Sequence, residues 1–299
     1  MNRWWIYQKE RFPILAHAPL IAAFSACAVS FSSLLRHAPV PGFPAYVAAF
    51  GVCLLMFLQL RIADEFKDAE EDARWRPYRP VPRGLVTLPE LRWVFIGAAL
   101  VQLALALWLD VRLLWVLGIA WSYLALMSVE FFCRDWLKAR PVIYLVTHMG
   151  IMPLVDFFAT ACDWMPALGR APAGLGWFLT ASFCNGIVIE VGRKLRQPAD
   201  EEEGVETYSR LWGKRGGLTV WMVALLATWG TAMLAARETG YVLWIAVPLG
   251  VEFVAAVLLG LRYLTGKIHG RKLEHFSAIW TLMLYLFLGL VPLIIRHFS

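Results

Sequence analysis

Nine apolar segments, each close to the length of a membrane helix, dominate this sequence. A helix needs about 20 largely apolar residues to cross the hydrocarbon core of a bilayer. The segments are 14–35, 43–62, 91–109, 111–131, 139–160, 173–192, 217–236, 240–261 and 275–295. With 60% hydrophobic residues and a mean hydropathy of +0.59, the composition excludes an ordinary soluble domain. We predict an all-α integral membrane protein, a single domain over residues 1–299 whose nine transmembrane helices form one bundle.

Basic residues are divided unequally between the two ends of this predicted bundle. The N-terminus and the loops after the second, fourth, sixth and eighth segments, with their edges, hold 22 of the 28 Lys and Arg residues. Such an excess marks the cytoplasmic side of a membrane protein. We therefore expect a cytoplasmic N-terminus, and a location in the bacterial cytoplasmic (inner) membrane. The net charge of +6 reflects this topology and gives no case for a nucleic-acid partner.

The loop at about 63–90, which follows the second segment, is rich in carboxylates. Asp64, Asp68 and Asp72 are spaced four apart, which places them on one side of a helix that continues out of the membrane. Like charges at this spacing repel unless a cation neutralises them. Because Mg²⁺ combines one or two carboxylates with waters and substrate phosphates, we expect these acids to face water and bind Mg²⁺. The alternative is a solvated helix in which Lys67 balances part of the charge.

The same loop ends in RPVPRG, residues 79–84, which adds Arg79 and Arg83 on a rigid backbone. Guanidinium groups bind phosphate oxygens through paired hydrogen bonds, so these residues favour an anionic ligand.

A second charged loop, at about 193–216, follows the sixth segment on the same predicted face. Its candidate site residues are Glu190, Arg193, Lys194, Arg196 and Asp200. An ion pair from Glu190 to Lys194 and a wet loop would also account for this pattern. An anionic ligand bridged by a metal between the two loops explains both loops at once.

The first loop resembles the leading motif of the UbiA superfamily of intramembrane prenyltransferases, NDxxDxxxD followed by RPxPxG. Here the motif reads Asp64-Glu65-x-x-Asp68-x-x-x-Asp72, with Asp64 in place of the usual Asn, and RPVPRG matches the second part.

The second loop departs from the family pattern, which has a DxxxD pair before a glycine. Asp200 lies four residues before Gly204 as in the family, but Arg196 takes the place of the first Asp. The region YLALMSVEFFCRDW, residues 123–136, also lacks the family's usual Lys-Arg pair after the helix-four tyrosine.

The resemblance implies a Mg²⁺-dependent transferase that ionises an isoprenoid diphosphate and passes the prenyl group to a lipophilic or aromatic acceptor in the lipid bilayer. Neutralising the leaving group lets the allylic C–O bond ionise, and aromatic faces stabilise the cation. The metal ligands expected from it are Asp64, Asp68, Asp72 and Asp200, with Glu190 as a further catalytic carboxylate. The substrate-binding residues expected are Lys67, Arg79, Arg83, Asn185, Arg193, Lys194 and Arg196.

Two other functions are compatible with the same residues. A terpene cyclase of this superfamily would use the same diphosphate site without a separate acceptor, and Arg196 and the atypical region after the fourth segment suit it. A permease would relay ions through Glu190, Asp156 and Glu252, although the sequence shows no inverted repeat.

Polar residues inside apolar segments are candidates for function, because an unpaired charge in hydrocarbon is costly. Asn185 and Glu190 lie one or two turns from the second acidic loop. We expect Glu130 and Asp156 near helix ends, where water solvates them, and His148 as a packing residue.

Overall fold

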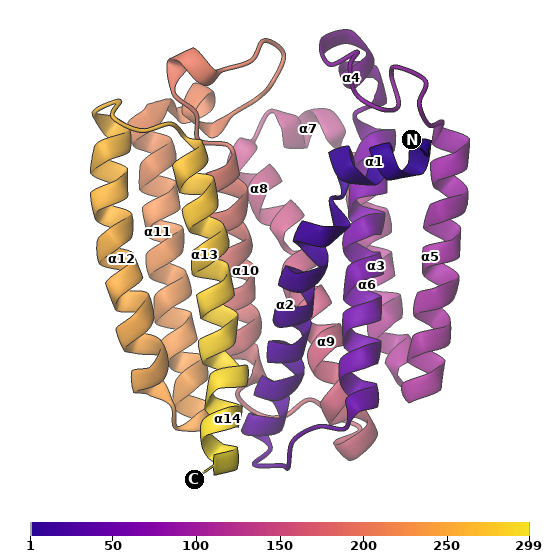
Figure 1. The fold of residues 1–299 in the computed structure, drawn as a ribbon, viewed down its shortest axis with the longest axis vertical. Coiled ribbons are helices and arrows are strands. Elements are labelled where there is room, and N and C mark those ends of the chain that lie inside the picture. The colour runs from indigo at the N-terminus through magenta and orange to yellow at the C-terminus, as the bar shows by residue number, and fades with distance from the viewer. Residues whose placement is uncertain (1, 299) are drawn as a thin grey trace.

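The computed structural model describes residues 2–298, and all regular structure in that part of the chain is helical (Figure 1). The elements are α1 (Arg3–Arg11), α2 (Ile14–Leu35), α3 (Phe43–Lys67), α4 (Ala69–Trp75), α5 (Leu88–Leu109), α6 (Leu113–Ser128), η1 (Glu130–Phe132), α7 (Arg134–Lys138), α8 (Pro141–Met149), α9 (Ile151–Leu168), α10 (Leu175–Arg193), η2 (Pro198–Asp200), α11 (Tyr208–Thr239), α12 (Val242–Leu264), α13 (Arg271–Leu288) and α14 (Leu290–Phe298). The prediction of an all-α membrane protein is confirmed.

Eight helical segments of the described chain are long and apolar enough to cross a membrane. Two of these segments contain a break, at Gly150 between α8 and α9 and at Gly289 between α13 and α14. The fourth predicted segment, 111–131, corresponds to α6, which is apolar but only 16 residues long. At 1.5 Å per residue, α6 spans about 24 Å. The number of nine spanning helices therefore stays a prediction.

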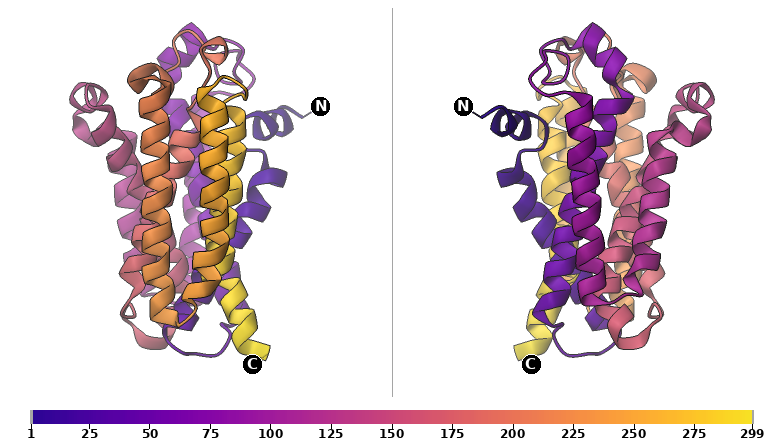
Figure 2. Two further views of the ribbon diagram at one scale, coloured as in Figure 1. Left: turned by 90° about the vertical axis from the view of Figure 1, so that its left-hand side faces the viewer. Right: turned by 90° about the vertical axis from the view of Figure 1, so that its right-hand side faces the viewer.

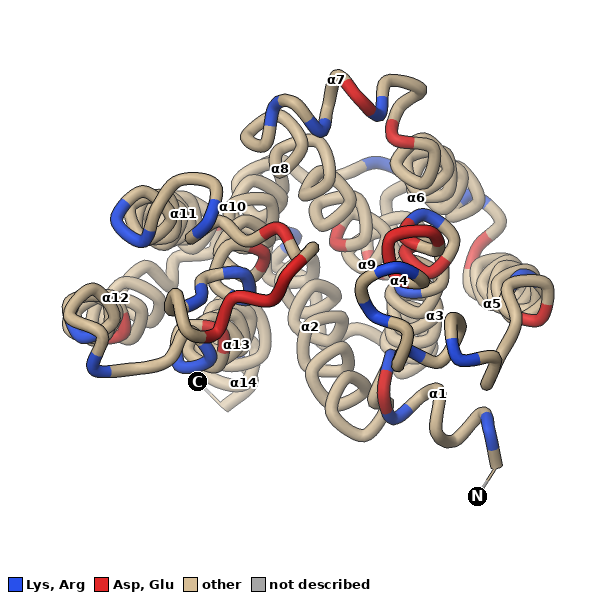
Figure 3. The backbone as a smooth tube through the Cα atoms, turned by 90° about the horizontal axis from the view of Figure 1, so that it is seen from above, with Lys and Arg blue, Asp and Glu red and all other residues tan. Residues whose placement is uncertain are grey.

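The long helices pack in two groups that meet at α2 and at the contact between α9 and α10. On one side α10 packs against α11 and α13, and α12 packs against both α11 and α13; on the other, α9 packs against α3 and α6, and α5 packs against α3 (Figure 3). α2 contacts α3, α9 and α13, so it joins the two groups. The main hydrophobic core runs between these helices.

Gly289 shows how closely α13 approaches α2. A Cβ atom on Gly289 would lie 2.2 Å from the carbonyl oxygen of Cys27, which is far inside van der Waals contact. Only glycine permits two backbones to approach this closely. The contact therefore fixes the position where α13 ends and α14 begins.

α4, α7 and the loop 194–207 lie together at one end of the bundle, which we call the polar end (Figures 1 and 2). α1 lies beside α3 near the same end. A small apolar cluster of Tyr7, Ile62, Val86 and Leu91 anchors α1 to α3 and to the start of α5. The polar end thus holds both acidic loops and the N-terminal helix.

Candidate functional site

α3 and α4 carry the first acidic motif in one nearly continuous helical register. α3 ends at Lys67 and α4 begins at Ala69, but backbone hydrogen bonds cross the junction. The N–H of Asp68 donates to the carbonyl of Asp64 at 2.9 Å, and the N–H of Asp72 donates to the carbonyl of Asp68 at 2.8 Å. The three aspartates therefore stay on one side of the helix, although their surroundings differ.

Asp72 is buried, and arginines surround its carboxylate. Arg76 donates to Oδ1 at 3.0 Å, Arg79 donates to Oδ2 at 2.5 Å, and Nη2 of Arg11 lies 4.0 Å away. Arg11 also donates to Glu65. Since Asp72 is only 2% exposed, the expectation that this acid faces water is wrong. A buried carboxylate requires such partners, and these ones tie the RPVPRG loop and α1 to α4.

Asp64 and Asp68 are the partly exposed acids of the first motif. The side chain of Asp64 is 43% exposed and lies 3.2 Å from Arg61. The carboxylate of Asp68 makes no hydrogen bond or ion pair with any residue from 2 to 298. Burial and the nearby Asp64 carboxylate raise the pKa of Asp68 above its ordinary value, and Lys67 opposes this only in part. A cation bound between the two carboxylates would remove this repulsion.

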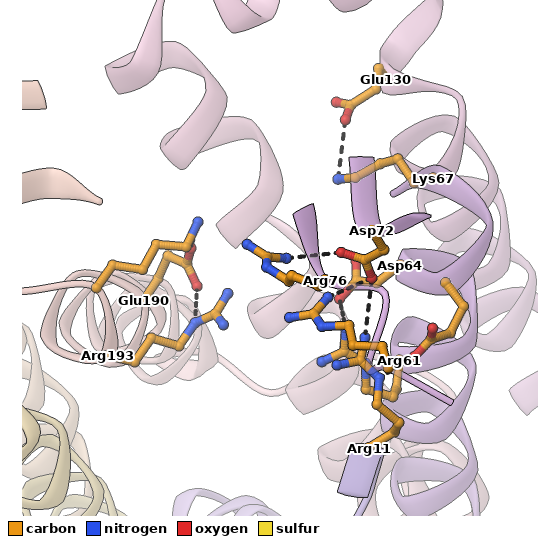
Figure 4. Close-up of polar contacts among 12 residues, drawn as sticks. Arg11, Arg61, Asp64, Lys67, Asp72, Arg76, Glu130, Glu190 and Arg193 are labelled. Atoms are coloured by element: carbon orange, nitrogen blue, oxygen red, sulfur yellow. Dashed lines mark hydrogen bonds and ion pairs between the residues drawn. The ribbon is translucent and has the colours of Figure 1, made fainter. Parts of the chain in front are cut away.

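The last turn of α10 faces the carboxylate of Asp64 across the polar end (Figure 4). Arg193 donates to Glu190 at 2.6 Å, and Nζ of Lys194 lies 2.9 Å from the other oxygen of Glu190. Arg193 is also close enough to Asp64 for electrostatic attraction. Lys194 lies 5.6 Å from the ring centre of Tyr208. Asp64 on α3 therefore opposes Arg193 on α10, and Glu190 pairs with both Arg193 and Lys194.

Arg196 and Asp200 lie on another side of the second loop, toward α13. Arg196 is 3.5 Å from Glu274 and donates to the carbonyl of Leu195, while Asp200 lies 3.1 Å from Nδ1 of His269. In the described chain these contacts do not join Arg196 or Asp200 to the first motif. These contacts do not test the predicted roles in binding diphosphate and metal, but the ion pair with Glu274 favours a position of Arg196 outside the site.

Two other candidate substrate-binding residues have structural partners. Asn185 is fully buried in α10 and accepts a hydrogen bond from Thr281 of α13 at 3.2 Å. Arg83 donates to Glu10 at 2.9 Å and to the carbonyl of Tyr78 at 2.8 Å, which fixes the RPVPRG loop against α1. Neither contact tests whether these residues also reach a substrate.

The two acidic loops touch each other through Trp75 and Gly204. Gly204 has a φ of +72°, and a Cβ atom there would lie 2.4 Å from the Trp75 ring. Glycine is therefore needed both for the backbone angle and for the close approach. This contact joins the end of α4 to the loop that follows α10.

A charged cluster beside the first motif links α3 to the segment after α6. Lys67 donates to the Tyr144 hydroxyl at 2.7 Å and lies 3.1 Å from Glu130, which lies 3.1 Å from Nε2 of His148. Glu130 is only 3% exposed, so the expectation of a solvated helix end is wrong for this residue. Burial alone would raise the pKa of Glu130, but His148 and Lys67 lower it to about 2.

Asp156 also departs from its expected position near a helix end. It is fully buried among the spanning helices, where the Tyr285 hydroxyl donates to its Oδ2 at 2.6 Å. The Tyr285 hydroxyl also lies 3.3 Å from Ser182. Asp156 therefore joins α9 to α13 inside the bundle instead of meeting interfacial water.

Sequence reasoning assigned no role to several residues at the polar end, namely Arg11, Arg61, Glu65, Arg76, Tyr144 and Tyr208. Arg11 belongs to the short N-terminal helix, and no motif connects it to an aspartate 61 positions later. Tyr208 and Tyr144 lie close enough to interact electrostatically, although 64 residues separate them. The one sequence signal for these residues was their position among charged residues at the ends of apolar segments.

The carboxylates of Asp64 and Asp68 have the chemistry that Mg²⁺ requires, since this ion binds oxygen ligands. In the described residues, no group of three His, Cys, Asp or Glu side chains is close enough to enclose a metal ion. Mg²⁺ keeps several waters and uses substrate phosphates as ligands, so two carboxylates suit an ion that binds together with its substrate.

Comparison with known proteins gives consistent matches in sequence and in fold. A digeranylgeranylglyceryl phosphate synthase of Korarchaeum cryptofilum is 26% identical over 240 residues, which is 79% of each chain. A second protein of that name, from Methanopyrus kandleri, is 27% identical over 199 residues, which is 66% of this chain and 68% of the other.

Two solved structures share the fold at low identity. An apo UbiA homologue from Aeropyrum pernix K1 has a TM-score of 0.68 and 13% identity, and the match covers 93% of this chain and 98% of the other. A structure giving insights into the biosynthesis of digeranylgeranylglyceryl phosphate synthase in membranes has a TM-score of 0.66 and 15% identity, covering 98% and 99%. The model of the UbiA prenyltransferase family matches residues 22–291. Since this match covers most of the sequence, the chain belongs to the UbiA prenyltransferase family.

Proposed function

We propose that this protein is a Mg²⁺-dependent intramembrane transferase that cleaves an isoprenoid diphosphate and passes the prenyl group to a lipophilic or aromatic acceptor. One observation carries the proposal: the partly exposed Asp64 on α3 opposes Arg193 on α10, and each has a second residue of the same charge close by in the chain, Asp68 and Lys194. Family membership favours this enzyme over the permease alternative.

The opposed charges suit a diphosphate. Asp64 and Asp68 would hold Mg²⁺, which neutralises charge on the leaving group when bound. Arg193 and Lys194 donate to phosphate oxygens from the facing helix, and charge-assisted bonds of this kind are the strong ones. Glu190 orients both cations at the end of α10, because each of them forms an ion pair with it. We propose that Lys67 donates to the same ligand from the α3 side.

The reaction then follows from this binding. The allylic C–O bond breaks, and its electron pair leaves with the diphosphate that Arg193 and Lys194 hold. The resulting cation would be stabilised by aromatic ring faces, and the rings of Tyr144 and Tyr208, which lie beside Lys67 and Lys194, are the candidates that we propose. An acceptor then supplies an electron pair for the new bond to the prenyl carbon and loses a proton. Surrounding apolar helices exclude water, which would otherwise capture the cation.

We propose that the polar end faces the cytoplasm, because most basic residues gather there. The bacterial inner membrane is the location that we expected from sequence, whereas both curated relatives named above are archaeal. Both are named for making digeranylgeranylglyceryl phosphate, so a geranylgeranyl donor and a glyceryl phosphate lipid acceptor belong in the substrates to be tested.

The test is an assay of diphosphate release by the purified protein in lipid nanodiscs with Mg²⁺. Geranyl, farnesyl and geranylgeranyl diphosphates are each offered alone, with a geranylgeranylglyceryl phosphate acceptor, and with aromatic acceptors. We expect release and a prenylated lipid product only with an acceptor, and loss of both when EDTA removes Mg²⁺. A cyclic product formed without any acceptor would show that the protein is a terpene cyclase and not a transferase. If no diphosphate were released in any combination, both functions would be contradicted.

A pair of matched variants connects the assay to the site. Asp68→Asn should lower the rate of release by on the order of a hundredfold, the usual effect of removing one electrostatic contributor in an active site. Glu70→Gln, an exposed acid on the same short helix, should keep the wild-type rate. Wild-type rates in both variants would show that Asp68 contributes nothing to the reaction.

A further inference from the structure

Three consecutive residues after α6 have an unusual backbone. Glu130, Phe131 and Phe132 have φ angles of +51°, +52° and +59°, in the left-handed region that favours glycine, yet none of them is glycine. Residues keep such angles only where the surrounding structure holds them, and they gather at functional sites. We therefore asked which side-chain contacts hold this segment in its left-handed conformation.

The side chain that this segment places is the carboxylate of Glu130. It is buried, and three groups from two other helices surround it at 3.1 Å: Nζ of Lys67, the hydroxyl of Tyr144 and Nε2 of His148. The His148 ring is itself fixed, because it stacks on Tyr144 and its Nδ1 lies 2.9 Å from the Tyr144 carbonyl. Glu130 thus meets a preformed set of partners.

Lys67 is the member of this set that adjoins the candidate diphosphate site (Figure 4). It is the last residue of α3, next to Asp68, and is close enough to Asp64 for attraction. An ammonium group has three N–H donors, and here Tyr144 and Glu130 take two of them. Without Glu130, the flexible lysine would turn toward Asp64 and Asp68 and neutralise the carboxylates that a metal needs.

We propose that Glu130 is a positioning residue: it keeps Lys67 away from the Asp64 and Asp68 carboxylates and directs its remaining N–H toward the diphosphate. The left-handed segment Glu130–Phe132 is the element that brings this carboxylate to Lys67. The inference rests on the proposed function, because it assigns a role within the same diphosphate site.

The test is a double-mutant cycle on binding, with inorganic diphosphate and Mg²⁺ as the probe and calorimetry as the readout. Glu130→Gln and Lys67→Met should each weaken binding by about tenfold, the effect of losing one hydrogen bond to a charged group. The double variant should bind only about as weakly as Lys67→Met, because no lysine is left to misplace. Losses that multiply to about a hundredfold would overturn the proposal.

Folding and the proposed function are controlled separately. Glu130→Asp keeps the charge but shortens the side chain, so it should weaken diphosphate binding less than Glu130→Gln does. In the Lys67→Met background, Glu130→Asp should cause no further loss of affinity. If Glu130→Gln fails to fold, the cycle is carried out with Glu130→Asp. Glu70→Gln serves as the control for an exposed acid and should bind like the wild type. If the wild type binds no Mg²⁺–diphosphate, both the proposed function and this role for Glu130 fail. If the wild type binds but the losses multiply, only the role of Glu130 fails.

Discussion

Two neighbouring aspartates of one motif are predicted to fail in different ways when they are changed. Asp72→Asn should lose both activity and stability, whereas Asp68→Asn should lose activity alone. From sequence we expected both acids to face water, so that either could be removed without unfolding the protein. The structure separates them, because Asp72 is buried among arginines and Asp68 has no ion pair with a described residue.

The magnitude follows from the partners of Asp72. Its removal leaves Arg76 and Arg79 without their shared carboxylate, with Arg11 close by. Breaking a buried ion pair from one side costs about 3–5 kcal/mol, because the remaining charge is left uncompensated. The arginine side chains are 9–20% exposed, so the lower end, about 3 kcal/mol, is the better expectation. For Asp68→Asn the expected change is close to zero or slightly stabilising, since a repulsion is removed.

Thermal unfolding in nanodiscs, followed by tryptophan fluorescence, measures this difference. At about 2–4 °C per kcal/mol, Asp72→Asn should melt on the order of 10 °C below the wild type. Asp68→Asn should melt within about 2 °C of the wild type. Diphosphate release, measured on the same samples below the melting range, should be lost in both variants.

A second substitution sharpens the result. Arg79→Gln in the Asp72→Asn background removes one of the uncompensated charges, so part of the lost stability should return. If Asp72→Asn melts with the wild type, the ion pairs around Asp72 contribute nothing to folding and our reasoning about the polar end is refuted. A further loss of stability in the double variant would refute the assignment of uncompensated arginine charge as the cause.

Three further predictions concern the polar end. Because the pKa of Glu130 lies below its ordinary value of 4.5, at about 2, its contribution to stability is complete above pH 4.5 and is lost toward pH 2. The difference in melting temperature between the wild type and Glu130→Gln should therefore shrink over that range, and a constant difference would contradict the shift. Arg196→Asp should change affinity for Mg²⁺–diphosphate less than twofold, since Arg196 points to Glu274; a tenfold loss in calorimetry would place it in the site. Cysteines replacing Glu70 and Glu202 should react with an impermeant thiol reagent from the same side, and labelling from opposite sides would exclude a shared site.

The sequence predicted the membrane fold well, because hydrophobic length is a local property of the chain. It also located both acidic loops, because their charges are likewise a local property of the chain. The contact of Trp75 with Gly204 places the two loops together. The errors concern environment. Burial of Asp72 depends on Arg11, which reaches it only after α1 docks on α3. Repulsion among the aspartates indicated that a cation was needed. The sequence could not show whether that cation is an arginine side chain or Mg²⁺.

Glu130 shows a second limit. Its position after an apolar segment is typical of a solvated helix end, and only the left-handed backbone of residues 130–132 turns it inward. The sequence has no glycine or asparagine at these positions that would predict a left-handed turn. The absence of the family's usual Lys-Arg pair nearby was visible, but what replaces it required the three-dimensional arrangement.

The packing of α13 against α2 has a consequence for the order in which the protein matures. α2 is synthesised early and α13 late. The surface of α2 that packs against Gly289 therefore lacks this partner while the intervening helices enter the membrane. Throughout that interval Asp156 on α9 lacks the Tyr285 hydroxyl, its closest partner in the finished bundle. A nascent chain that ends before α13 therefore lacks one of the hydrogen bonds that make this buried acid tolerable in the membrane. The arrival of α13 thus completes two contacts together, the close approach of Gly289 to α2 and the hydrogen bond from Tyr285 to Asp156.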